Sequence, residues 1–252
     1  MPKSQIALQL YTLRNFAKTP ADIAKTIKKV RQIGYEVVEL AGLGAIKPEE
    51  LKKITDDNGV TICSAHDSYQ QMRDETQSII DKYSILGCKH LGCGIFGERS
   101  AEGYAKFAKE ASEVAKKLAK AGIALSYHNH SFELEKYDGR TGLEILYAES
   151  DPKALNAQID VFWIQHGGGD PAAWIKKLSG RTPTVHLKDM VISNGKQLFA
   201  EVGEGNLNWP AILDACKESG VLWYIVEQDT CQRDPFESVE ISFKNLKKMG
   251  LK

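Results

Sequence analysis

The sequence has 252 residues, and 33 lysines and arginines balance 33 aspartates and glutamates, so the formal net charge is zero. No nucleic acid and no membrane surface is therefore expected as a partner, because both are bound through an excess of basic residues. A small-molecule partner is favoured. The length suits one (β/α)8 barrel or two small domains.

Five cysteines form an odd set without a CxxC pair. This pattern favours reduced thiols in a cytoplasmic protein over a disulfide framework. No apolar run is long enough to span a bilayer, and the first residues pass straight into a strand-like run. Neither a membrane segment nor a signal peptide is therefore expected. A homo-oligomer is compatible with these features.

The first half of the chain alternates strand and helix signals. Apolar residues at helical spacing, prolines at helix starts and glycines after helix ends, such as Gly34 and Gly122, mark the helices. These signals predict helices over 21–33, 49–58, 71–86 and 101–121. The apolar runs between them predict strands over 6–11, 35–40, 60–65, 89–94 and 123–129.

The second half repeats the pattern with shorter helices, expected over 141–148, 170–178, 209–219 and 234–249, and with strands over 157–162, 184–189 and 222–227. Eight strand-helix units without a break in composition predict the α/β class and a single TIM barrel domain over residues 1–252. The rival doubly wound sheet would require a glycine-rich first turn, and residues 10–14 contain no glycine.

The run 183–189 (PTVHLKD) is apolar at first and ends in metal-capable and charged side chains. Strand alternation puts His186 and Lys188 on one face. Asp160 and Glu227 end two other predicted strands, and the carboxyl ends of all barrel strands meet at one mouth. A lone histidine is usually structural, but the coincidence across three strands favours a shared site for one divalent cation.

Further polar side chains are expected at the same end of the barrel. Hard oxygen donors mixed with imidazole suit Mn, Mg, Co or Zn. Glu39 is expected to be a structural carboxylate hydrogen-bonded to its neighbours, and Cys63 a small buried hydrophobe. For His66 two positions remain open: it either lines a substrate pocket or fills the top of the barrel. Asp189 is expected to be a solvated neighbour of Lys188. Substrate contacts are expected from Gln9, His66, Glu133, Trp163, His166 and Lys188.

Five motifs carry a family resemblance: 9–14 (QLYTLR), 127–133 (YHNHSFE), 160–163 (DVFW), 186–189 (HLKD) and 201–209 (EVGEGNLNW). They resemble the sugar phosphate isomerase/epimerase family of xylose isomerase-like barrels, which includes inosose dehydratases, ketose 3-epimerases and, more distantly, endonuclease IV. The resemblance covers essentially the whole chain. The motifs are specific for the superfamily and do not name a substrate, because members share a barrel and differ in their loops.

The resemblance implies one divalent ion held by Glu, Asp, His and Glu from strands five to eight. The last three fall on Asp160, His186 and Glu227, whereas strand five offers His128 in place of glutamate. That departure argues against two-carboxylate epimerisation. His128 is then expected as the fourth ligand, and His128, His130 and Glu227 are the candidates for proton transfer. Trp163 replaces a histidine that such epimerases often carry.

The chemistry implied by the resemblance is proton abstraction next to a carbonyl of a keto sugar, sugar phosphate or inosose, leading to isomerisation, epimerisation or dehydration. Two other classes remain. A non-catalytic sugar-binding or regulatory barrel would keep the fold without the strand-five glutamate. A DNA repair endonuclease would need a multi-zinc cluster and a basic groove, and six histidines at zero net charge favour neither.

Overall fold

The computed structural model describes residues 5–94 and 97–251. In this range eight strands close into a barrel in the order β1-β12-β9-β8-β5-β4-β3-β2, and each neighbouring pair is parallel. The predicted (β/α)8 barrel is confirmed. The barrel strands are β1 Ile6–Gln9, β2 Val37–Leu40, β3 Thr61–His66, β4 His90–Cys93, β5 Ala124–His128, β8 Leu155–Asp160, β9 Thr184–Leu187 and β12 Trp223–Val226.

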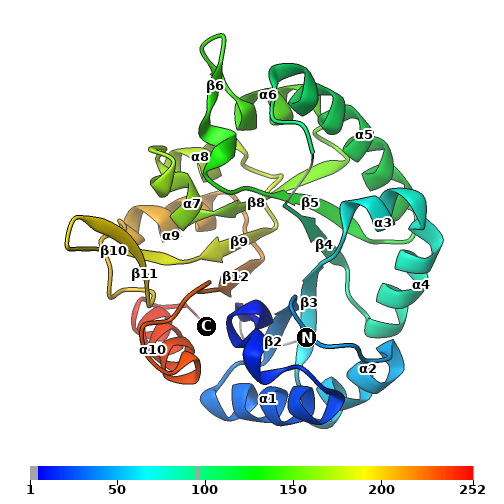
Figure 1. Cartoon of the computed structure of the whole chain (residues 1–252), viewed down its shortest axis with the longest axis vertical. Helices are drawn as coiled ribbons and strands as arrows, with labels where there is room; N and C mark the ends of the chain where they lie inside the picture. Colours follow the sequence, from blue (N-terminus) through cyan, green and yellow to red (C-terminus); the bar gives the residue numbers. More distant parts are fainter. Residues whose placement is uncertain (1–4, 95–96, 252) are drawn as a thin grey trace.

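Helices surround the barrel, as Figure 1 shows. No helix in residues 5–94 and 97–251 has the length and apolarity needed to cross a membrane. The helices are α1 Pro20–Ile33, α2 Pro48–Asp57, α3 Tyr69–Asp74, α4 Thr76–Leu86, α5 Ala101–Ala119, α6 Gly142–Glu149, α7 Val161–His166, α8 Pro171–Lys177, α9 Trp209–Glu218 and α10 Pro235–Lys248, with 3-10 turns at η1 Leu10–Phe16 and η2 Phe132–Leu134.

Several predicted elements differ from the structure. The helix expected over 71–86 is two helices, because the chain leaves helical geometry at Glu75. The strand expected over 157–162 ends at Asp160, whose side chain accepts a hydrogen bond from the Trp163 amide and so caps α7. The strand expected over 6–11 ends at Gln9, whose side chain accepts from the Tyr11 amide at the start of η1.

Two hairpins were not predicted. One pairs β10 Asp189–Ser193 with β11 Lys196–Ala200, and the other pairs β6 Lys136–Tyr137 with β7 Arg140–Thr141. Their turns are Asn194-Gly195 and Asp138-Gly139, and all four residues have positive φ. Asx-Gly turns of this kind match the twist of the flanking strands. Because β10 starts at Asp189, the barrel strand expected over 184–189 is shorter and ends at Leu187.

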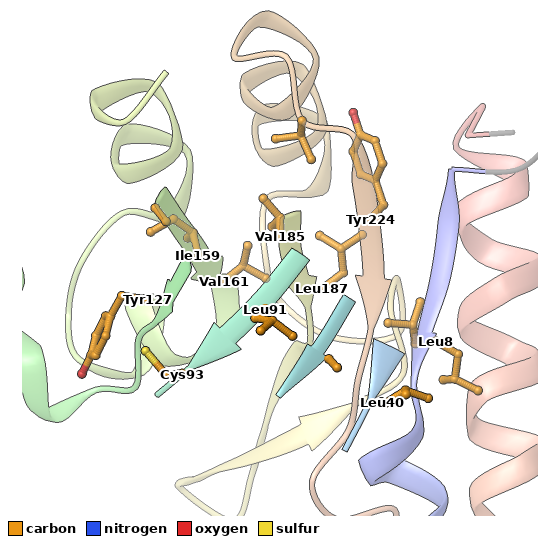
Figure 2. Close-up of a cluster of buried hydrophobic side chains, with 14 of the residues drawn as sticks. Leu8, Leu40, Leu91, Cys93, Tyr127, Ile159, Val161, Val185, Leu187 and Tyr224 are labelled. Atoms are coloured by element: carbon orange, nitrogen blue, oxygen red, sulfur yellow. The ribbon is translucent and has the colours of Figure 1, made fainter. Parts of the chain in front are cut away.

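The core has two parts. The large cluster lies between the strands and the helices, and Figure 2 shows Leu8, Leu91 and Val185 among its side chains. A small cluster of Ala7, Val37, Cys63 and Ile225 is separate from it. Cys63 is therefore the buried small hydrophobe that was expected. By strand alternation this small cluster shares a face with Gln9, Glu39 and Glu227, and it forms the floor beneath the polar site.

Candidate active site at the carboxyl end of the barrel

The strands bring four metal-capable side chains together. Asp160 at the end of β8 pairs with His186 on β9, His128 ends β5, and Glu227 follows β12. All four side chains are buried, and one ligand atom from each lies within 4.8 Å of the others. These are the residues that the sequence analysis proposed as ligands, and they are called the ligand cluster below.

The donor atoms of the ligand cluster fit a divalent cation. His128 Nε2 lies 3.2 Å from Asp160 Oδ2, and His186 Nδ1 lies 2.8 Å from Glu227 Oε2. The second pair is not aligned as a hydrogen bond, and Lys188 Nζ also lies 2.8 Å from Glu227 Oε2. Buried imidazole and carboxylate groups need ion pairs or a metal ion to offset the cost of burial. A divalent cation suits this mixed set of nitrogen and oxygen donors.

Lys188 brings a permanent positive charge to the ligand cluster. Its Nζ lies 3.0 Å from Asp160 Oδ2, 2.8 Å from Glu227 Oε2 and 3.1 Å from Asp229 Oδ2. Burial by itself would lower the pKa of Lys188, but these carboxylates raise it above its ordinary value. Burial favours a raised pKa for Glu227, but Lys188 and His186 lower it well below its usual range. Lys188 was expected beside the substrate, and it lies against the ligand carboxylates as well as the cavity.

Glu39 on β2 lies behind His186. Its Oε2 accepts from Gln9 Nε2 at 2.6 Å and lies 2.5 Å from His186 Nε2, while its Oε1 accepts from Gln158 Nε2 at 2.7 Å. Burial by itself would raise the pKa of Glu39, but His186 and His66 lower it to about 2. Glu39 is thus hydrogen-bonded to its neighbours, as expected. Because it engages Nε2, it leaves His186 Nδ1 for the ligand cluster, as carboxylates do behind metal-bound histidines.

His130 and Glu133 form a separate pair. Glu133 is fully buried and accepts from the Tyr127 hydroxyl at 2.7 Å and from the His130 amide at 2.8 Å. It is not among the described residues that line the cavity, and its two hydrogen bonds hold the β5 loop. Burial, only partly offset by the Tyr127 hydrogen bond, raises the pKa of Glu133 to about 7.

The imidazoles of His128 and His130 are both neutral at neutral pH. Burial, together with the nearby His186, lowers the pKa of His128 well below its usual value. Burial also lowers the pKa of His130 to about 4, although Asp160 opposes this effect. His130 Nδ1 is buried and lies 4.0 Å from Glu133 Oε1. The neutral ring of His130 lies next to the ring of His128 and lines the cavity.

A cavity of about 1040 Å³ opens at this end of the barrel. It is lined by Gln9, His66, His128, His130, Trp163, Lys188 and Glu227 among others. His66 therefore lies in the cavity wall, the first of the two positions that the sequence left open. His166 does not belong to the described lining: it is exposed at the end of α7, and its ring stacks on Phe162 at 5.6 Å. The expected substrate contact of His166 is thus not supported by its position.

Asp189 is the residue whose environment was predicted wrongly. Its carboxylate is fully buried, not solvated. Oδ1 accepts from the amides of Met190 and Leu207, and Oδ2 accepts from the amides of Gly203 and Gly205 and from Trp209 Nε1. The 201–209 motif therefore wraps around the carboxylate of the 186–189 motif, which anchors the loop behind Lys188.

Two site residues were missed by the sequence analysis, Gln158 and Asp229. Gln158 lies two residues before Asp160 on β8, and Asp229 lies two residues after Glu227. Gln158 shares its strand face with Asp160, so alternation could have indicated it, whereas Asp229 lies beyond β12. Their amide and carboxylate groups contact Glu39 and Lys188 respectively.

Comparisons with known proteins agree with the fold. The sequence profile of the xylose isomerase-like TIM barrels matches residues 27–249. The rhizopine catabolism protein MocC of Rhizobium meliloti is 22% identical over 90% of this chain and 82% of its own length. An inosose dehydratase of Lactiplantibacillus plantarum is 26% identical over 55% of this chain and 54% of its own length. The fold is shared with a sugar phosphate isomerase/epimerase from Parabacteroides distasonis, with a TM-score of 0.83, 23% identity and coverage of 99% and 96%.

Proposed function

Because the chain belongs to the xylose isomerase-like TIM barrel family, we propose that it is a metal-dependent enzyme that removes a proton next to a carbonyl. The substrate class is a keto sugar, sugar phosphate or inosose, and the outcome is isomerisation, epimerisation or dehydration. The observation that carries the proposal is the buried ligand cluster, which opens on the cavity beside His130. Inososes are the first substrates to test, because one relative is an inosose dehydratase.

The ligand cluster of His128, Asp160, His186 and Glu227 would hold the cation. A bound divalent cation supplies positive charge that stabilises the negative charge developing on a carbonyl oxygen. Lys188 lies against the carboxylates of this cluster and at the cavity, where its ammonium would exchange one carboxylate contact for a hydrogen bond to a substrate oxygen. Because the cluster is buried, these charges act with little screening by water.

His130 is the base in this proposal. Its ring is neutral at neutral pH, since burial lowers its pKa, and the residue lines the cavity. Glu133 fixes the His130 backbone through the amide hydrogen bond. His128 is less suited to this role, because its Nε2 contacts Asp160 within the ligand cluster. Proton transfer by a positioned side chain contributes about 10²–10⁴-fold to rate.

Metal content tests the ligand cluster. The purified protein is expected to bind one equivalent of Mn²⁺, Co²⁺ or Zn²⁺, and His186→Ala is expected to lose it while keeping the fold. His90→Ala is the control, because His90 begins β4 at the opposite end of the barrel and is expected to keep the metal. Full metal occupancy in His186→Ala by elemental analysis would rule out this ligand assignment.

Solvent deuterium incorporation tests the chemistry. Wild-type protein loaded with metal is expected to exchange the α proton of a keto sugar or inosose, and His130→Gln is expected to slow exchange at least about 100-fold with its metal retained. His90→Gln is the matched control. Exchange by His130→Gln at the wild-type rate would assign the base elsewhere, with Glu227 as the next candidate. Metal binding without exchange into any substrate of these classes would favour a sugar-binding barrel.

A further inference from the structure

Three hydrogen-bonded side chains connect the buried Glu39 to the wall of the cavity. Glu39 Oε1 accepts from Gln158 Nε2 at 2.7 Å, and Gln158 Oε1 lies 2.5 Å from His66 Nε2. The three residues come from β2, β8 and β3. Glu39 and Gln158 are fully buried, whereas His66 is partly exposed and lines the cavity. The chain thus ends on a ring that a substrate can reach.

The direction of each hydrogen bond follows from the chemistry of its groups. A carboxylate only accepts, so Gln158 must turn its NH₂ group toward Glu39. The carbonyl oxygen of Gln158 then faces His66, and it also only accepts. His66 Nε2 must therefore carry the hydrogen. In a neutral imidazole the other nitrogen, Nδ1, is then an acceptor with a free lone pair.

We propose that Glu39, acting through Gln158, fixes His66 with its hydrogen on Nε2, so that Nδ1 accepts a hydrogen bond from a substrate hydroxyl. His66 is then a catalytic residue that accepts a hydrogen bond from a hydroxyl of the substrate, and Gln158 is a positioning residue that orients the His66 ring. The substrate-binding part of this inference rests on the proposed function, whereas the state of the His66 ring does not. A substrate with a carbonyl at this position would place two acceptors against each other and bind less well.

The neighbouring backbone protects the hydrogen bond between His66 and Gln158. Gly92 on β4 pairs with His66 in the sheet. A Cβ built on Gly92 would lie 2.6 Å from His66 Nε2 and 2.9 Å from Gln158 Oε1, which is too close for either contact to persist. The absence of a side chain at Gly92 therefore allows this hydrogen bond to form. Gly92→Ala therefore perturbs the hydrogen bond between His66 and Gln158 without changing Glu39, Gln158 or His66.

Histidine ring protons in NMR spectra test the inference directly. The His66 Nε2 proton, assigned by its loss in His66→Gln, is expected to be visible and protected from exchange with water in the purified protein, with or without Mg²⁺. Gln158→Met keeps the length of the side chain but cannot accept from the ring, and is expected to lose the signal. Gln9→Met is the matched control, because Gln9 also donates to Glu39 but does not contact His66 within the described residues.

The outcomes separate this inference from the proposed function. Loss of the signal in Gln158→Met and Gly92→Ala, with retention in Gln9→Met, supports it even if the protein shows no turnover. A wild-type ring with the hydrogen on Nδ1, a doubly protonated ring at pH 8, or a signal that persists in both variants would overturn it. In an active protein, Gln158→Met is expected to lower kcat/KM about tenfold for a hydroxylated substrate, and an unchanged kcat/KM would remove the role in binding.

Discussion

The carboxylate of Asp189 holds a whole loop, so replacing it should cost a large part of the stability. Asp189→Asn is nearly isosteric, but one of its two oxygens becomes an NH₂ group that cannot accept. If the amide replaces Oδ1, the amides of Met190 and Leu207 lose their acceptor. If the NH₂ group replaces Oδ2, three donors lose their acceptor, including the Trp209 indole. At least two charge-assisted hydrogen bonds are therefore lost in either orientation.

Hydrogen bonds to charged groups contribute about 1.5–3 kcal/mol each, so Asp189→Asn should lower the free energy of unfolding by about 3–6 kcal/mol. A typical domain has only about 5–15 kcal/mol in total. Urea unfolding followed by circular dichroism measures the loss. Trp209→Phe is the matched comparison, because it removes a single donor to the same carboxylate and should cost about 1.5–3 kcal/mol.

A loss for Asp189→Asn no larger than the loss for Trp209→Phe would refute the reasoning, because it would mean that the backbone amides of the loop do not depend on the carboxylate. Lys188 precedes Asp189 in the chain, so a loosened loop should also weaken the contacts of Lys188 with the ligand cluster.

Three further predictions concern neighbouring groups. Gly205→Ala should destabilise the same loop, because its Cβ would lie 2.4 Å from Asp189 Oδ1, and urea unfolding should show it. Glu133→Gln should change the pH dependence of stability. Burial raises the pKa of Glu133 from 4.5 to about 7, so between these pH values the folded wild type binds a proton that the unfolded chain does not. The stability of wild type should therefore fall relative to the variant by about 3 kcal/mol as pH rises from 4.5 to 7. Parallel plots of unfolding free energy against pH for the two proteins would contradict this. Lys188→Met should cost about 3 kcal/mol in metal-free protein by leaving buried carboxylates unpaired. Added Mn²⁺ should then raise the Tm of the variant more than that of wild type, and equal shifts would argue against a shared site.

The barrel itself could be predicted from the sequence because its signals are local. Apolar periodicity and capping residues act within one element, and eight strand-helix units leave few topologies. The Asn194-Gly195 and Asp138-Gly139 turns are equally local, so both unpredicted hairpins were readable from the chain. Asp189 was placed wrongly because four of its five donors lie 14 to 20 residues away, in a loop whose amide directions no local pattern reveals.

The group around Glu39 could not be derived from the sequence, because its partners come from distant strands. Gln158 is 119 residues away from Glu39 along the chain, and His186 is 147 residues away. Alternation places each side chain on the inner face, but it does not say which amide oxygen faces which ring. That information arises only when the barrel closes and the strand register is set.

Strand β3 shows how a small irregularity decides the site. Strict alternation would put Cys63 and His66 on opposite faces, since they are three residues apart. The pairing of β2 with β3 shifts between Val38 and Glu39, so that Glu39 is opposite Ser64. Cys63 can then join the small inner cluster while His66 still turns toward Gln158. A bulge of this kind re-aims the side chains that follow it. Without the shift, His66 would point toward the helices, and the hydrogen-bonded chain that begins at Glu39 would end inside the barrel without reaching the cavity.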